Sequence, residues 1–109
     1  MAAFRADDRV LLLAIPSQAD LAAIARVLMS GVLVALGTAD EVDEARRSMS
    51  DFENVMFIEA SPEQIPWREA YFSKILVPPH LESLLPQITS ELHRVLAPGG
   101  QIVRSAVEA

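Results

Sequence analysis

Two short runs of the sequence are apolar at every position, and they constrain the fold more than any other feature. Residues 10–15 and 32–36 contain only aliphatic side chains, with no alternation between apolar and polar positions. A strand with one face in water alternates, whereas a strand covered on both faces reads as an unbroken apolar run. We therefore expect both runs to be central strands of a parallel sheet with helices on both sides.

Helical patterns and further strands alternate with these two runs. Three more strands are predicted, at residues 54–58, 72–77 and 101–107. Apolar residues also recur at intervals of three and four, as on one face of a helix: Leu21, Ile24, Ala25 and Leu28; Val42, Ala45 and Met49; Leu81, Leu84, Leu85, Ile88, Leu92, Val95 and Leu96. Pro86 fits the third helix only in its first turn, after a cap near Ser83. This alternation predicts an α/β fold, a three-layer α/β/α open parallel sheet of about five strands with right-handed crossovers.

Composition limits the classes of partner. The chain has 109 residues, which suits a single domain spanning residues 1–109, and it contains no cysteine. The formal net charge of −6 argues against nucleic-acid binding, which needs clustered lysine and arginine. The amino-terminal residues lack a signal-peptide pattern, and no apolar run reaches the roughly 20 residues of a membrane span. We expect a cytoplasmic protein with no nucleic-acid partner and no membrane partner.

The carboxyl ends of the predicted strands carry small and polar residues. Ligands of open α/β sheets bind in the crevice at these ends, and the candidates there are Ser17, Gly37, Thr38 and Ser61. Residues 17–20 and 38–41 resemble capping boxes, and residues 61–64 look like a helix start with proline at the first position. We therefore expect the chain's own side chains to occupy helix amides that a ligand would use.

The two histidines offer little chemistry on sequence grounds. His80 follows the fourth predicted strand and is a candidate general base at the rim of the crevice, although a partly exposed loop histidine is the simpler interpretation. His93 lies in the long predicted helix, and the two side chains lack the spacing of metal ligands. We expect no metal site and no catalytic residue.

Two longer segments carry a recognisable order of residues. Residues 91–103 end a helix, turn at Pro98, Gly99 and Gly100, and begin an apolar strand, while residues 54–67 run from an apolar strand into a loop with two prolines and a tryptophan. The first resembles the R-V-L-x-P-G-G segment, and the second the N-V-x-F-x-x-G-D-A-E-x-L-P-F segment, of class I S-adenosylmethionine-dependent methyltransferases of the type 11-like group. The resemblance extends over residues 9–103. It implies a Rossmann-like sheet with strand order 3-2-1-4-5 and S-adenosylmethionine as the cofactor.

The positions that bind the cofactor in that family are largely replaced. The family has a glycine-rich loop after its first strand, whereas residues 12–18 contain no glycine. Gly37 stands where an acid would bind the ribose hydroxyls, and Ala60 and Ser61 replace a Gly-Asp pair at the adenine loop. We predict a minimal, degenerate member without a cofactor, which acts as an assembly or regulatory module. The alternative is a divergent small-molecule methyltransferase that binds S-adenosylmethionine in the crevice of Ser17, Gly37, Thr38 and Ser61. Binding of a different nucleotide in the same crevice is a third, weaker option.

The resemblance also predicts an open edge of the sheet. The family continues with a sixth and a seventh strand beside the fifth, and this sequence lacks them. Residues 101–107 would then form an unpaired edge, and such edges invite association unless they are blocked. We expect a homodimer or a protein partner at this edge or on the helix face beside it, with a monomer as the alternative.

Overall fold

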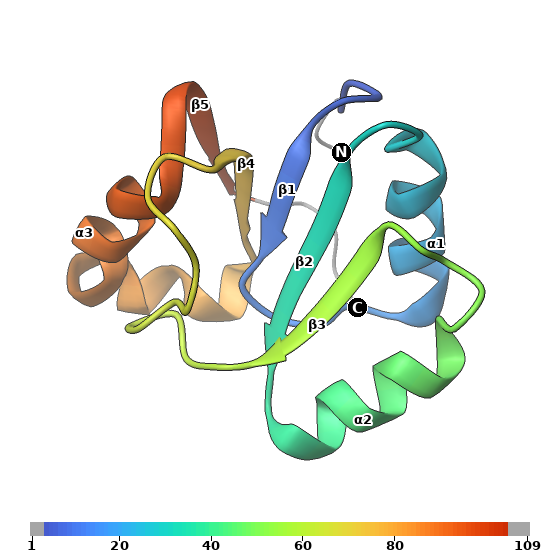
Figure 1. The fold of residues 1–109 in the computed structure, drawn as a ribbon. Helices are drawn as coiled ribbons and strands as arrows, with labels where there is room; N and C mark the ends of the chain where they lie inside the picture. The colour runs from blue at the N-terminus through green and yellow to red at the C-terminus, as the bar shows by residue number, and fades with distance from the viewer. Residues whose placement is uncertain (1–3, 105–109) are drawn as a thin grey trace.

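The computed structural model describes residues 4–104, and a parallel sheet of five strands forms its centre (Figure 1). The strands are β1 (Arg9–Leu12), β2 (Val32–Gly37), β3 (Val55–Glu59), β4 (Phe72–Val77) and β5 (Leu96–Arg104). They pair in the order β3-β2-β1-β4-β5, and every pair is parallel. The predicted fold class and strand order are confirmed.

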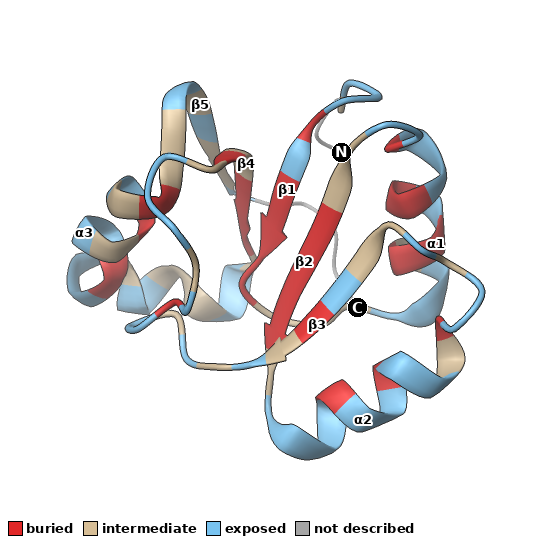
Figure 2. Ribbon diagram, viewed as in Figure 1, coloured by how far each residue is buried: buried red, intermediate tan, exposed pale blue. Residues whose placement is uncertain are grey.

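Helices cover both faces of the sheet. On one face lie α1 (Gln18–Val27) and α2 (Ala39–Ser48), and on the other lie the 3₁₀ helix η1 (Pro79–Leu84) and α3 (Leu85–Val95). Alternate residues of a strand enter opposite cores, so that Val10 and Leu12 pack with α1 and α2 while Leu11 packs with α3. Figure 2 shows buried residues along β1 and β2 and on the helix surfaces turned toward the sheet. Within residues 4–104, no helix is long and apolar enough to cross a membrane.

The first and last strands differ from their predicted bounds. β1 ends at Leu12 rather than at residue 15: the N–H of Leu13 still donates to the carbonyl of Leu76 at 3.4 Å, after which the chain leaves the sheet. β5 begins directly after α3, and residues 97–100 bulge out between two paired positions of β4. Gly99 takes a φ of +80° in this bulge, so the expected turn lies inside the strand. The predicted residues 105–107 of the last strand lie outside the described residues.

The third predicted helix is divided into two segments. Residues 79–84 form the separate turn η1, and α3 starts after Leu84, whose side chain makes no capping hydrogen bond. The cap expected near Ser83 lies one residue later, at Leu84, and the placement of Pro86 in the first helical turn is confirmed. A proline ring clashes with the carbonyl four residues earlier, so the α-helix cannot extend back through residue 82.

The connection from β3 to β4, residues 60–71, crosses the second face without a helix and is fastened to α3. A carboxylate oxygen of Glu91 accepts the N–H of Ile65 at 2.6 Å. The Arg94 guanidinium donates to the carbonyls of Ile65 and Trp67 at 2.7 and 2.9 Å, and to both oxygens of Glu91. These hydrogen bonds, led by that from Arg94, hold the pKa of Glu91 below its ordinary value despite partial burial.

Candidate functional site

An open groove lies at the carboxyl ends of β2 and β3, which finish side by side (Figure 1). Its volume is about 570 Å³, which falls within the roughly 300–1,000 Å³ of small-molecule sites. We call it the rim groove. Residues from the loop after β1, the end of β2, the start of α2, the loop after β3 and η1 line it. The predicted crevice is therefore present as a cavity in the structure.

Three of the four candidate residues line the rim groove. Gly37 ends β2, Thr38 precedes α2, and Ser61 follows β3. Ser17 does not line the groove; it caps the amino terminus of α1, where its Oγ accepts the N–H of Asp20 at 3.2 Å. Because the carboxyl ends of parallel strands meet at one edge of a sheet, the three residues come together although they are far apart in the chain.

Gly37 is covered by a side chain from the loop after β1. A Cβ at residue 37 would lie 2.7 Å from Cδ1 of Ile15 and 3.1 Å from a carboxylate oxygen of Glu41. Both distances are shorter than ordinary van der Waals contacts. A carboxylate side chain at this position would require the tip of the Ile15 side chain to move aside.

Thr38 and Glu41 form the predicted capping box at the start of α2. The Thr38 Oγ1 accepts the N–H of Glu41 at 3.3 Å, and Oε1 of Glu41 accepts the N–H of Thr38 at 2.9 Å. One oxygen of the acid nearest to Gly37 is thus already hydrogen-bonded to the backbone. The pattern at residues 17–20 gives only the Ser17 hydrogen bond, without the reciprocal one.

Ser61 lies in a turn, and the helix predicted to start there is absent from the described chain. Its Oγ accepts the N–H of Glu63 at 3.2 Å, and its carbonyl accepts the N–H of Gln64 at 3.1 Å. The next residue, Ile65, is buried and donates its N–H to Glu91, which pulls the chain away from a helical path. Tertiary contacts therefore override the local helix-start pattern.

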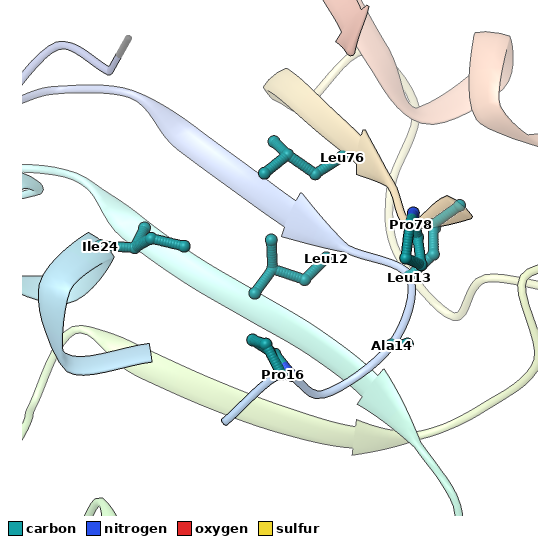
Figure 3. A pocket seen from close by; sticks show the side chains of 7 residues that line it. All are labelled: Leu12, Leu13, Ala14, Pro16, Ile24, Leu76 and Pro78. Carbon is teal, nitrogen blue, oxygen red and sulfur yellow. The ribbon is translucent and has the colours of Figure 1, made fainter. Parts of the chain in front are cut away.

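The loop after β1 packs down onto the sheet. Figure 3 shows the side chains of Leu12, Leu76, Ile24, Pro16 and Pro78 gathered around the end of β1. They line a small, partly open cavity of about 30 Å³. This loop presents apolar side chains instead of a glycine-rich backbone that a ligand could approach closely.

Two of the polar side chains that line the rim groove are acidic. Glu41 and Glu59 line it together with His80, and none of the lining residues in the described chain is lysine or arginine. Glu59 pairs in register with Gly37 and makes no hydrogen bond with another described side chain. It was not among the predicted candidates, although its place directly after the apolar run of residues 55–58 could have identified it. No three His, Asp or Glu side chains in residues 4–104 lie close enough to share a metal ion.

No protein-family model matches the chain, and no curated protein matches it by sequence. Solved structures match it in fold. A SAM-dependent methyltransferase of Aquifex aeolicus superposes with a TM-score of 0.78 at 18% identity, over 91% of this chain and 56% of the other. A putative methyltransferase of Bacillus halodurans gives a TM-score of 0.76 at 25% identity, over 94% and 46%.

A third structure, the YcgJ protein of Bacillus subtilis, gives a TM-score of 0.76 at 23% identity, over 91% of this chain and 44% of the other. The chain therefore spans about half the length of the structures that it matches. The likeness concerns the backbone path, which places the rim groove at the same end of the sheet as the ligand crevice of open α/β folds.

Proposed function

The chain has a class I methyltransferase-like fold, and from that premise we propose that it serves as a non-catalytic assembly or regulatory module. Fold alone does not determine activity, so the activity must be inferred from the residues of the site. The observation that carries the proposal is the contact of Ile15 with Gly37. The Ile15 side chain lies against Gly37, where the resemblance to methyltransferases would require a carboxylate for the ribose of the cofactor.

Two neighbouring features support the same conclusion. The loop after β1 has no glycine and is packed against Ile24 and Leu76, so its backbone is not free to cradle a ligand. The capping box ties up both the hydroxyl of Thr38 and one oxygen of Glu41. The donor and acceptor set of the rim groove therefore does not fit S-adenosylmethionine in the usual manner of the family.

The second candidate function is a divergent methyltransferase that binds S-adenosylmethionine in the rim groove. The volume of about 570 Å³ favours it, because this space suits a small molecule. In this case Ser61 and Thr38 would make hydroxyl contacts, and Glu59 would supply the carboxylate that Gly37 lacks.

Thermal unfolding with and without millimolar S-adenosylmethionine or S-adenosylhomocysteine separates the two candidates. A ligand at 100 times its dissociation constant would stabilise the folded chain by about 2.7 kcal/mol, and the proposal expects no shift with either ligand. A shift of several degrees that Ser61→Ala and Glu59→Gln together abolish would overturn the non-catalytic assignment.

A reopened site tests the role of Ile15 directly. Gly37→Asp alone should gain no ligand-induced shift, because Ile15 lies over the new side chain. The double variant Ile15→Gly with Gly37→Asp removes that obstacle and restores a carboxylate at the end of β2. If the double variant acquires a shift and the single variant does not, Ile15 is what closes the wild-type site.

We further propose that assembly uses the edge of β5. Within residues 4–104, this strand pairs only with β4, and Ile102 and Val103 are half-buried on it. Light scattering across a range of concentrations tests the homodimer form of this proposal. A mass that stays at 11.9 kDa throughout would contradict a homodimer.

A further inference from the structure

A second groove runs along the opposite edge of the sheet, at β3. It has a volume of about 420 Å³ and is lined by the end of α2, the loop after it and β3. Phe52, Val55 and Ile58 are half-buried there, and Met56 is 40% exposed. We call it the edge groove. It shares no lining residue with the rim groove, so the proposed site does not account for it.

Within residues 4–104, the backbone of β3 has one side that pairs with β2 and one side that no other strand pairs with. The carbonyl of Asn54 accepts the N–H of Leu33 at 2.8 Å, and the N–H of Ala60 donates to the carbonyl of Gly37 at 3.2 Å. Successive residues of a strand direct their peptide groups to opposite sides. The even-numbered residues of β3 therefore face β2, and the odd-numbered ones face away from the sheet.

One of these outward groups is covered by a side chain. The Arg46 guanidinium donates to the carbonyl of Phe57 at 3.0 Å, and the peptide groups of Val55 and Glu59 have no further partner in the described chain. An open strand edge beside an apolar groove is a template on which an extended segment can add as a new strand. The Arg46 side chain covers this edge through a single hydrogen bond, which a bound segment could replace.

The charge of the chain is concentrated on the same unit. Residues 39–63, which include α2 and β3, carry eight acidic and two basic side chains and thus the whole formal net charge of −6. Asp51 and Glu53 flank Phe52 in the chain, Glu59 follows Ile58, and all three acids are exposed. Of the two arginines, Arg47 faces Glu44 at 3.6 Å and Arg46 binds the Phe57 carbonyl. An occupant of the edge groove therefore meets apolar contacts within a negative surrounding.

We propose that the edge groove binds an extended basic segment of a partner protein. Its backbone pairs with the outward side of β3, its apolar side chains contact Met56 and Phe52, and its lysines or arginines lie among the acids. Main-chain hydrogen bonds and apolar contacts supply affinity, and the charge selects the partner. The inference goes beyond the proposed function and does not depend on what the rim groove binds.

A second copy of the chain is a poor occupant of this edge. A two-fold interface brings the same surface of both copies together, so β3 against β3 would place residues 39–63 of each copy against one another. Each of these units carries the full formal charge of −6. Like charges facing each other oppose that arrangement.

A fluorescent seven-residue peptide of alternating lysine and valine is the probe. Matched peptides alternate glutamate with valine, or group the same lysines and valines into two blocks. Fluorescence anisotropy measures affinity, and amide chemical shifts of the labelled protein locate the site. We expect saturable binding of the alternating lysine peptide alone, with shifts centred on residues 46–59, and weaker binding at about 0.5 M salt because the charges are screened.

Variants with opposite expected effects test the groove itself. Met56→Lys removes an apolar contact and adds a positive charge, and it should weaken binding about tenfold. Arg46→Ala uncovers the Phe57 carbonyl and removes a positive charge, and it should tighten binding about threefold. Thermal unfolding of each variant checks that the fold is retained.

A pair of matched double variants separates local contacts from overall charge. Asp51→Lys with Glu53→Lys should abolish binding, whereas Asp7→Lys with Glu69→Lys makes the same change in net charge elsewhere and should leave affinity within about twofold. Equal losses in the two doubles would overturn the proposal. So would absent binding, equal binding of the glutamate or block peptide, or shifts centred on the rim groove. Self-association that Met56→Lys abolishes would assign the edge to a second copy and would equally overturn it.

Discussion

Ala70 adopts a backbone conformation that its side chain disfavours. Its φ of +55° lies in the left-handed region, which costs about 1–2 kcal/mol for a residue with a Cβ. The N–H of Ala70 donates to the carbonyl of Arg94 and the N–H of Tyr71 to that of Val95, each at 2.9 Å. These two hydrogen bonds fix the end of the β3 to β4 connection against the end of α3. The strained conformation is thus imposed from outside the loop.

Replacing Ala70 by glycine should raise the free energy of unfolding. Glycine relieves the left-handed strain but is more flexible in the unfolded chain, so the expected net gain is about 0.5–1 kcal/mol. The control is Ala23→Gly at an exposed position inside α1, which should lose about 1 kcal/mol. Urea unfolding measures both variants. A loss in both would mean that the φ of Ala70 carries no strain worth relieving.

The β3 to β4 connection depends on two residues of α3. Glu91 and Arg94 are an i, i+3 pair whose side chains are 18% and 33% exposed, and they bind the backbone of Ile65 and Trp67 as well as each other. Glu44 and Arg47 have the same spacing on α2 but are 76% and 71% exposed and bind no backbone group. Glu91 and Arg94 therefore hold the connection against α3, and Glu44 with Arg47 is a matched pair on the surface that does not.

Glu91→Gln should cost about 1–2 kcal/mol, since a partly buried carboxylate with three donors becomes a neutral amide. Glu44→Gln should change stability by less than about 0.5 kcal/mol, as for exposed pairs in general. Urea unfolding measures the difference, and hydrogen exchange at the Ile65 amide tests its local origin. Faster exchange at Ile65 in Glu91→Gln alone is expected; equal exchange in both variants would show that the pair does not fasten the loop.

Elements with a local cause could be predicted from the sequence. β4 has its predicted bounds, because Pro78 and Pro79 directly follow its apolar residues 75–77. The helix start predicted at residues 61–64 was wrong, because the Ile65 N–H binds Glu91, a residue 26 positions later. The sequence of residues 61–64 alone cannot indicate that contact. Bounds failed in the same way at β5, where pairing with β4 continues across a bulge.

In the candidate site, too, some features could be predicted from the sequence and others could not. Gly37, Thr38 and Ser61 could be grouped in advance, because strand ends define the rim of a parallel sheet. Ser17 also follows a strand, but its hydroxyl faces the Asp20 N–H as a cap and not the groove. The contact of Ile15 with Gly37 depends on how a loop side chain packs, which neither spacing nor composition determines.

For the whole molecule, Asp8 ties the amino ends of two central strands together. It is 5% exposed and accepts the Arg5 N–H at 2.7 Å, the Ser73 hydroxyl at 2.9 Å and the Lys74 ammonium at 3.2 Å. Burial alone would raise the pKa of Asp8, but these hydrogen bonds and the charge of Lys74 outweigh it, so the pKa lies below its ordinary value. The pKa of Glu91 is lowered as well.

The lowered pKa values of Asp8 and Glu91 make the stability of the chain depend on pH in acid. Between the folded pKa and the unfolded value of about 4, the unfolded chain binds more protons than the folded one, so acid favours unfolding there. The contribution of Asp8 and Glu91 is therefore fully present above about pH 5 and is lost as the pH falls through their folded pKa values. Urea unfolding from pH 7 to pH 3 should show a flat region followed by a decline.

Asp8→Asn should be less stable than the wild type by about 3 kcal/mol at pH 7, because Lys74 loses its partner in a site with little water. The difference should narrow below about pH 4, since protonation of Asp8 removes the same ion pair from the wild type. The neighbouring Asp7→Asn, at an exposed position, should follow the wild-type profile within about 0.5 kcal/mol. A difference in the free energy of unfolding between Asp8→Asn and the wild type that stays constant down to pH 3 would contradict this prediction. Asp8 would then stabilise the contact of β1 with β4 through its shape and hydrogen bonds and not through its charge.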